Sequence, residues 1–169
     1  MIAPPSALRL VLDTNTVMAL WFFEDPALSP LRQLIEEARP PLIARADALE
    51  ELRRVLAYRQ FGIDPARQAD LLAAYSARVT TIGAADGDAA ASEPEGISPL
   101  PTCRDADDQK FLEIARDGRA THLVSRDKAL LRLNRHRLLR PLFAILTPET
   151  LTASLTTATA ATAATADSA

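Results

Sequence analysis

The chain has 169 residues, of which 48% are hydrophobic and 24% charged, and its formal net charge is −3. These values are typical of one globular domain and exclude a wholly disordered chain. The acidic excess argues against a protein that coats nucleic acid through bulk charge, but it is compatible with a site that handles phosphate through metal ions.

Short apolar runs and amphipathic segments alternate along the first part of the chain. The run Leu8–Leu12 is apolar apart from Arg9, and it is interpreted as a strand buried on both faces of a parallel sheet. A helix is expected over 16–23. Ser29, followed by a proline, has the pattern of an N-cap that opens a second helix. A second short strand is predicted over 42–44.

The middle of the chain continues this alternation. Asp47 is expected to open a helix, with Glu50 three residues later as in a capping box. Another helix starts at Asp64, which precedes a proline, and a strand is predicted over 79–82. The stretch Gly83–Pro101 is rich in alanine, glycine, proline and acidic residues and is predicted to be a surface loop.

Order is expected to resume after this loop. The acidic stretch Asp105–Asp108 leads into an apolar helical pattern that ends at Gly118. A strand over 121–124, a helix over 128–133 and a strand over 142–146 complete the alternation. Strands that alternate with helices indicate an α/β domain with a mainly parallel sheet.

The composition changes at the C-terminus. Beyond Leu155 the chain consists almost only of alanine, threonine, aspartate and serine, with no large apolar side chain to bury. We therefore expect one folded domain over 1–151 and a disordered low-complexity tail over 152–169.

Two acidic residues directly follow predicted strands or lie close to their ends. Asp13 follows the first strand, and Asp127 lies just after the strand over 121–124. Ligands of open α/β sheets gather at the carboxyl ends of the strands, so both positions favour a functional site. Each residue taken alone is explained equally well as a helix N-cap.

Two further carboxylates are predicted to face inward from helices. Helical phase places Glu51 near the apolar stripe of its helix, although a solvated surface acid is an equal alternative. Asp108 shares a face with Phe111 and Leu112, and one helix cap does not account for Asp105, Asp107 and Asp108 together.

Four converging carboxylates would repel one another unless positive charge gathers between them. All-oxygen ligands suit Mg²⁺ or Mn²⁺, and the scarcity of histidine and cysteine argues against a structural zinc site. A site of this kind is typical of phosphoryl transfer, in which a metal activates water and steadies the leaving oxygen.

Several motifs, in this order, resemble the PIN domain family, and specifically its bacterial group of toxin components of type II toxin–antitoxin systems. Individually the motifs are weak signals, but the ordered set is specific and covers about residues 8–151. The matching stretches are Leu10–Asn15 (LVLDTN), Leu49–Leu56 (LEELRRVL), Cys103–Leu112 (CRDADDQKFL), Leu123–Lys128 (LVSRDK) and Ile145–Pro148 (ILTP).

The resemblance implies a three-layer α/β/α sandwich around a central, mainly parallel sheet. It implies a hydrolase that binds Mg²⁺ or Mn²⁺ and cleaves RNA, acting as a metal-dependent endoribonuclease, with a cognate antitoxin protein as partner and a homodimer as assembly. Asn15 and Ser125 match family positions that support the acids by hydrogen bonds. The family's acidic set, both catalytic and metal-binding, carries over to Asp13, Glu51, Asp108 and Asp127.

Other interpretations of the same residues stay open. One is a non-catalytic module that binds RNA or an antitoxin and keeps a vestigial acidic pocket. Another is an Mg²⁺-dependent phosphatase with Asp13 as nucleophile, but Asn15 stands where such enzymes need a second aspartate. The basic stretch from Lys128 to Arg140 either contacts RNA phosphates or forms a solvated helix face.

The sequence also bears on location. No apolar run approaches the roughly 18 residues that span a bilayer, and residues 1–6 carry no basic cluster typical of a signal peptide. Cys103 is the only cysteine, so an internal disulfide is excluded and a reducing compartment fits best. We expect a cytoplasmic protein without membrane contact.

Overall fold

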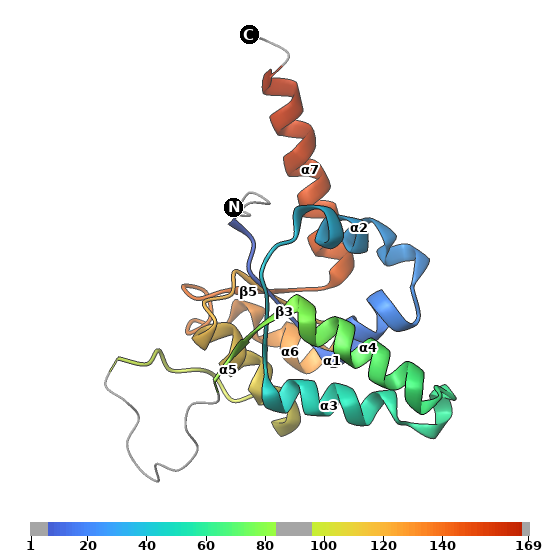
Figure 1. The fold of residues 1–169 in the computed structure, drawn as a ribbon. Coiled ribbons are helices and arrows are strands. Elements are labelled where there is room, and N and C mark those ends of the chain that lie inside the picture. The colour runs from blue at the N-terminus through green and yellow to red at the C-terminus, as the bar shows by residue number, and fades with distance from the viewer. Residues whose placement is uncertain (1–6, 84–95, 167–169) are drawn as a thin grey trace.

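A parallel sheet forms the centre of the computed structural model, which describes residues 7–83 and 96–166, with side chains up to residue 157. The five strands are arranged in the order β3-β2-β1-β4-β5, and every neighbouring pair is parallel (Figure 1). This arrangement confirms the predicted sheet. The strands are β1 (Leu10–Leu12), β2 (Leu42–Arg45), β3 (Val79–Ile82), β4 (His122–Val124) and β5 (Ala144–Leu146).

Helices cover both faces of the sheet. Along β1, Leu10 and Leu12 pack into one apolar cluster while Val11 packs into the other, as alternating side chains of a doubly covered strand must. The first cluster includes side chains of α1, α2 and α7, and the second includes side chains of α5 and α6. The α/β/α sandwich is therefore confirmed. The helices are α1 (Thr14–Val17), η2 (Met18–Phe22), η3 (Pro26–Leu28), α2 (Ser29–Ala38), α3 (Ala46–Leu56), η4 (Arg59–Phe61), α4 (Pro65–Arg78), η5 (Ala106–Asp108), α5 (Gln109–Asp117), α6 (Lys128–Arg132), η6 (Leu133–Arg135) and α7 (Pro148–Ala166).

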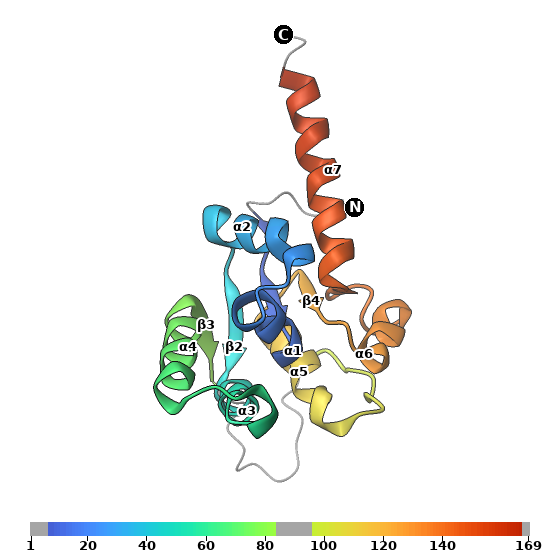
Figure 2. The ribbon, with the colours of Figure 1, turned by 90° about the vertical axis from the view of Figure 1, so that its right-hand side faces the viewer.

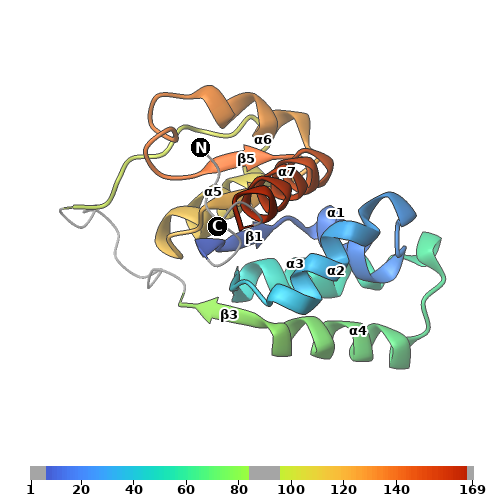
Figure 3. The same ribbon diagram turned by 90° about the horizontal axis from the view of Figure 1, so that it is seen from above.

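The strand order reverses beside β1. The chain passes from β1 to β2 and β3 on one side, and then places β4 and β5 on the other side. Helix α4 consequently lies at the β3 edge of the sheet and α6 at the β5 edge (Figure 3). In open α/β sheets a ligand crevice forms at such a switch point, between the carboxyl ends of the strands. Here those ends belong to β1 and β4.

Local capping follows the sequence prediction at one helix and departs from it at two others. The Asp64 carboxylate accepts a hydrogen bond from Arg67 N at 3.0 Å and caps α4 as predicted. Ser29 lies inside α2, whose N-cap is Leu28. The predicted capping box at Asp47 and Glu50 is wrong, because α3 begins one residue earlier, at Ala46.

The side chains of that supposed capping box have other partners. Asp47 accepts two hydrogen bonds from the guanidinium of Arg45, at 2.9 and 2.7 Å, and Glu50 forms ion pairs with Arg53 and Arg54. Asp47 also accepts a hydrogen bond from Ala48 N at 2.9 Å, so only Glu50 is held by charged partners alone.

The C-terminal segment differs from the expected disordered tail. Helix α7 continues without a break from Pro148 to Ala166 and projects from the body of the molecule (Figure 1). Leu151 and Leu155 lie one helical turn apart and are both buried in the first apolar cluster. Threonine hydroxyls such as that of Thr156 donate to carbonyls one turn earlier, and alanine is the strongest helix former. Residues 167–169 of the predicted tail lie outside the described residues.

The long predicted loop is described only in part. Its residues 84–95 lie outside the described ranges, and residues 96–103 form neither helix nor strand. Among the described residues, no helix is long and apolar enough to cross a membrane.

Candidate active site

Asp13 lies at the carboxyl end of β1, where the strand turns into α1. One of its carboxylate oxygens accepts a hydrogen bond from Thr16 N at 2.8 Å, and the other accepts one from the Ser125 hydroxyl. The residue is only 4% exposed, and burial raises the pKa of Asp13 despite these hydrogen bonds. Asp13 is therefore both the N-cap of α1 and a buried acid at the switch point.

Asp127 has the equivalent position after β4. Its Oδ1 accepts hydrogen bonds from Ala129 N at 2.6 Å and Leu130 N at 3.3 Å, so it caps α6. Its own backbone N–H donates to the Ser125 hydroxyl at 2.9 Å. Ser125, which is fully buried, thus joins the ends of β1 and β4 by donating to Asp13 and accepting from Asp127.

Glu51 reaches the same region from α3. Its Oε1 accepts a hydrogen bond from the Thr14 hydroxyl at 2.7 Å, and its Oε2 forms an ion pair with the Lys110 ammonium group. Lys110 also donates to the carbonyl of Asp107 at 2.6 Å. Glu51 therefore links α3 to α1 and to α5. Figure 2 shows β2 running into α3 near the start of α1.

Asp108 completes the set at the start of α5. Burial, followed by the charges of Asp127, Asp105, Asp13 and Glu51, raises the pKa of Asp108 to about 6. Such Coulombic effects require the groups to be close. The four predicted carboxylates are thus near enough for the charges of the other three to act on Asp108, and we name them the acid cluster: Asp13, Glu51, Asp108 and Asp127.

The neighbouring polar residues behave differently from one another. Asp105 accepts a hydrogen bond from Asp107 N at 3.0 Å and caps η5, and both residues are exposed. Asn15 is also exposed, and its side chain makes no hydrogen bond within the described residues. Of the two predicted supporting residues, Ser125 contacts the acid cluster in this structure.

Sequence reasoning did not identify Thr14 and Lys110 as parts of the site. Both act through Glu51, which is 37 positions from Thr14 along the chain. Thr14 does lie within the LVLDTN stretch, between Asp13 and Asn15, so the motif itself could have indicated that Thr14 belongs to the site. Lys110 lies within the CRDADDQKFL stretch, but its pairing with Glu51 is set by the packing of α3 against α5 and not by any local pattern.

The comparison with protein families bears directly on this geometry. The model of the PIN domain matches residues 9–129, a stretch that includes the whole acid cluster. The chain belongs to the PIN domain family. No curated protein and no solved structure matches it. PIN domains generally are nucleases, so this fold is of the nuclease type.

The donors in this PIN domain are suited to a hard divalent cation. They are all carboxylates, and burial together with the neighbouring negative charges raises the pKa of Asp108, while the ammonium of Lys110 pairs with Glu51. Within the described ranges, no three acidic, histidine or cysteine side chains are close enough to form a metal-binding group. Mg²⁺ usually keeps several waters and needs only one or two carboxylates, so the acid cluster fits such an ion.

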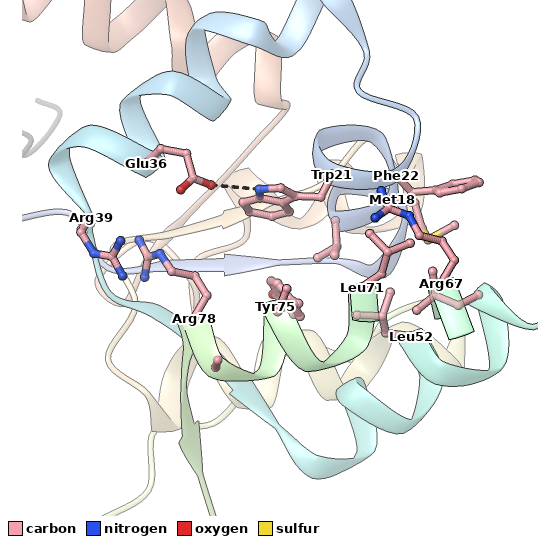
Figure 4. Close-up of a pocket in the computed structure, with 14 residues that line it drawn as sticks. Met18, Trp21, Phe22, Glu36, Arg39, Leu52, Arg67, Leu71, Tyr75 and Arg78 are labelled. Carbon is pink, nitrogen blue, oxygen red and sulfur yellow. Dashed lines mark hydrogen bonds between the residues drawn. The ribbon is translucent and has the colours of Figure 1, made fainter. Parts of the chain in front are cut away.

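A separate cavity of about 440 Å³ lies between η2, α2, α3 and α4 of the PIN domain (Figure 4). Its lining is mainly apolar, and its one carboxylate, Glu36, accepts a hydrogen bond from Trp21 Nε1 at 3.0 Å. Tyr75 lines this cavity and is close enough to Asp13 for that carboxylate to add to the effect of burial, which raises the pKa of Tyr75. The cavity therefore adjoins the acid cluster but does not contain it.

Proposed function

We propose that this PIN domain is a metal-dependent endoribonuclease that hydrolyses RNA phosphodiester bonds at the acid cluster. The observation that carries the proposal is that Asp13 and Asp127 meet at the buried Ser125 hydroxyl, with Asp108 and Glu51 near enough to interact with them by charge. Helix capping alone does not require several carboxylates to lie near one another, and their mutual repulsion lowers the stability of the folded state when no cation is bound. Membership of the PIN domain family supports the same conclusion.

The residues of the acid cluster would hold Mg²⁺ or Mn²⁺, which when bound lowers the pKa of a coordinated water and offsets charge on the phosphate. In the reaction, a water oxygen forms a bond to phosphorus and the water gives up a proton, while the bond from phosphorus to the leaving oxygen breaks and that oxygen takes up a proton, so that one water is consumed overall. The protein's part is orientation: Ser125 fixes Asp13, the α6 backbone fixes Asp127, and Thr14 with Lys110 fixes Glu51.

A cleavage assay tests this proposal. A labelled single-stranded RNA is incubated with the full chain, with and without Mn²⁺, and the cut sites are mapped. We expect cleavage that depends on Mn²⁺ and is abolished by Asp13→Asn. The matched control is Asp70→Asn, an exposed acid on α4, which should cleave like wild type. Equal cleavage by wild type and Asp13→Asn in matched preparations would contradict the proposed site.

One observation favours a second candidate, a non-catalytic module with a vestigial pocket. The described residues hold no preformed group of three metal-binding side chains. Calorimetric titration with Mn²⁺ separates the two functions. A nuclease site should bind Mn²⁺ in the wild type and lose that binding in Asp13→Asn, whereas a vestigial pocket should bind negligibly in both.

The toxin role is a finer part of the proposal, and it rests on the resemblance to the bacterial toxin components. We propose a cognate antitoxin protein as partner and a homodimer as the assembly. Co-purification with the product of a neighbouring reading frame tests the first, and light scattering of the purified chain tests the second. A solitary gene would count against the toxin role without affecting the nuclease proposal.

A further inference from the structure

A row of basic side chains follows the acid cluster along the chain. All five of its members are exposed, and none makes an ion pair or a side-chain hydrogen bond within the described residues. We name this group the basic strip: Lys128, Arg132, Arg135, Arg137 and Arg140.

Six lysine and arginine side chains of the described residues form ion pairs with carboxylates. The members of the basic strip do not, a property that they share with other exposed arginines such as Arg59 and Arg67, and they differ from those two in lying next to Asp127 along the chain. The basic residues that do have carboxylate partners are Arg45, Arg53, Arg54, Lys110, Arg116 and Arg126.

The basic strip begins at the acid cluster and leads away from it. Lys128 directly follows Asp127 and opens α6, which continues into η6. Lys128 and Arg132 are four residues apart and Arg135 follows after three, so these three side chains share one helix face. This face lies at the β5 edge of the sheet, opposite α4 (Figure 3).

Like charges held along one face repel one another, and a polyanion relieves that repulsion. The surface lacks the apolar anchors expected at the centre of a protein interface, because the large exposed hydrophobic residues of the described chain are Phe23, Tyr58 and Ile97, all outside the strip. Isolated exposed cations in a row are instead suited to the phosphates of a nucleic acid backbone.

We propose that the basic strip binds the RNA backbone on one side of the scissile phosphate, through charge and without reading the bases. This inference rests on the proposed nuclease function, because that function supplies the reason for RNA to lie at Asp127. The basic strip would hold the RNA so that a phosphate lies over the acid cluster. The five residues of the strip are therefore positioning residues for the substrate.

The first test measures binding without catalysis. Anisotropy of a labelled single-stranded RNA is titrated with the full chain in EDTA at several salt concentrations. For a single strand, each phosphate contact contributes about −0.7 to the slope of log binding constant against log salt. We expect Arg132→Gln/Arg135→Gln to weaken binding and to reduce the steepness of that slope by about 1.4.

The matched control removes two other exposed arginines that have no side-chain partner among the described residues. Arg59 and Arg67 lie on η4 and α4, at the opposite edge of the sheet. Arg59→Gln/Arg67→Gln makes the same charge change and should keep the wild-type slope. Wild-type binding by the strip variant, or an equal loss in the control, would overturn the proposal.

A kinetic readout separates this inference from the proposed function. If the chain cleaves RNA, the strip variant should raise KM while kcat stays near the wild-type value, because the lost contacts act on bound substrate and transition state alike. A fall in kcat at unchanged KM would contradict a positioning role. If the chain does not cleave RNA, the nuclease proposal fails, and the salt slope in EDTA still decides the role of the strip.

Discussion

Ser125 shows how a single buried hydroxyl organises the candidate site. It donates to Asp13, accepts from the backbone of Asp127, and is fully buried at the end of β4. Asp13 and Asp127 are each helix N-caps, so for both residues capping is compatible with a place in the candidate site. Capping fixes the direction of a carboxylate with backbone groups, which is what a preorganised site requires.

Asp108 is expected to lower the stability of the metal-free protein. Its pKa is raised to about 6 from an ordinary value of 3.8, so the folded state loses stability relative to the unfolded state as pH rises between these values. Asp108 makes no capping hydrogen bond, so asparagine can replace it without loss of a cap. We predict that Asp108→Asn raises the thermal midpoint at pH about 7 by at least about 2 °C.

A pH series checks this prediction. The gain from Asp108→Asn should shrink as the pH is lowered and vanish below about pH 3, where the carboxyl is protonated in both states. Asp70→Asn, on exposed α4, is the control and should shift the midpoint little at either pH. A gain that persists at low pH would mean that charge repulsion is not its cause.

At the scale of elements, the turn between α5 and β4 depends on a glycine for space. Gly118 has a φ of −79°, and it is the next residue, Arg119, that adopts the left-handed conformation with a φ of 50°. A Cβ on Gly118 would lie 2.5 Å from Cγ2 of Ile43 and 2.9 Å from the carbonyl of Ile114. The glycine is therefore needed because α5 packs closely on β2.

We predict that Gly118→Ala destabilises the fold by about 1–3 kcal/mol, the usual cost of overpacking a core. The measurement is the urea midpoint of unfolding. Gly83→Ala is the control, because a Cβ at that position has no atom within 4 Å. Wild-type stability of Gly118→Ala would show that Ile43 moves aside without cost.

The elements that sequence reasoning predicted well are those whose pattern is local. Leu10–Leu12, within the predicted run Leu8–Leu12, forms β1, because a doubly covered parallel strand is apolar on both faces. Helical phase predicts that Glu51 faces inward, and its hydrogen bond with Thr14 agrees with this prediction. The prediction that Glu50 belongs to a capping box is wrong, because Glu50 pairs with Arg53 instead. Tertiary partners such as Lys110 leave no trace in a local pattern.

For the whole molecule, strand order matters more than any single motif. The reversal beside β1 brings Asp13 and Asp127 near each other at the carboxyl ends of β1 and β4, although they lie far apart along the chain. Sequence indicated that both follow strands, but not that β1 and β4 are neighbours. Adjacency comes from long-range pairing of Leu10 with His122, which no local pattern specifies.

The C-terminal helix is also a property of the whole molecule. Leu155 is the last large apolar residue of the sequence. It is only 1% exposed to solvent and packs into the first apolar cluster. We predict that Leu155→Ala lowers the free energy of unfolding by about 2–5 kcal/mol. Urea unfolding measures this cost, with exposed Ala153 changed to Ser as the control. A disordered tail would instead tolerate Leu155→Ala without loss.

The proposed function requires that four carboxylates from four segments act as one metal-dependent site. The most direct measurement is the rate of Mn²⁺-dependent RNA cleavage by Asp13→Asn, Glu51→Gln, Asp108→Asn and Asp127→Asn, beside Asp70→Asn. We predict that each of the four substitutions in the acid cluster lowers the rate at least about 100-fold, a loss of about 2.7 kcal/mol in transition-state stabilisation, while Asp70→Asn matches the wild type. Wild-type rates in any of the four variants would contradict the claim.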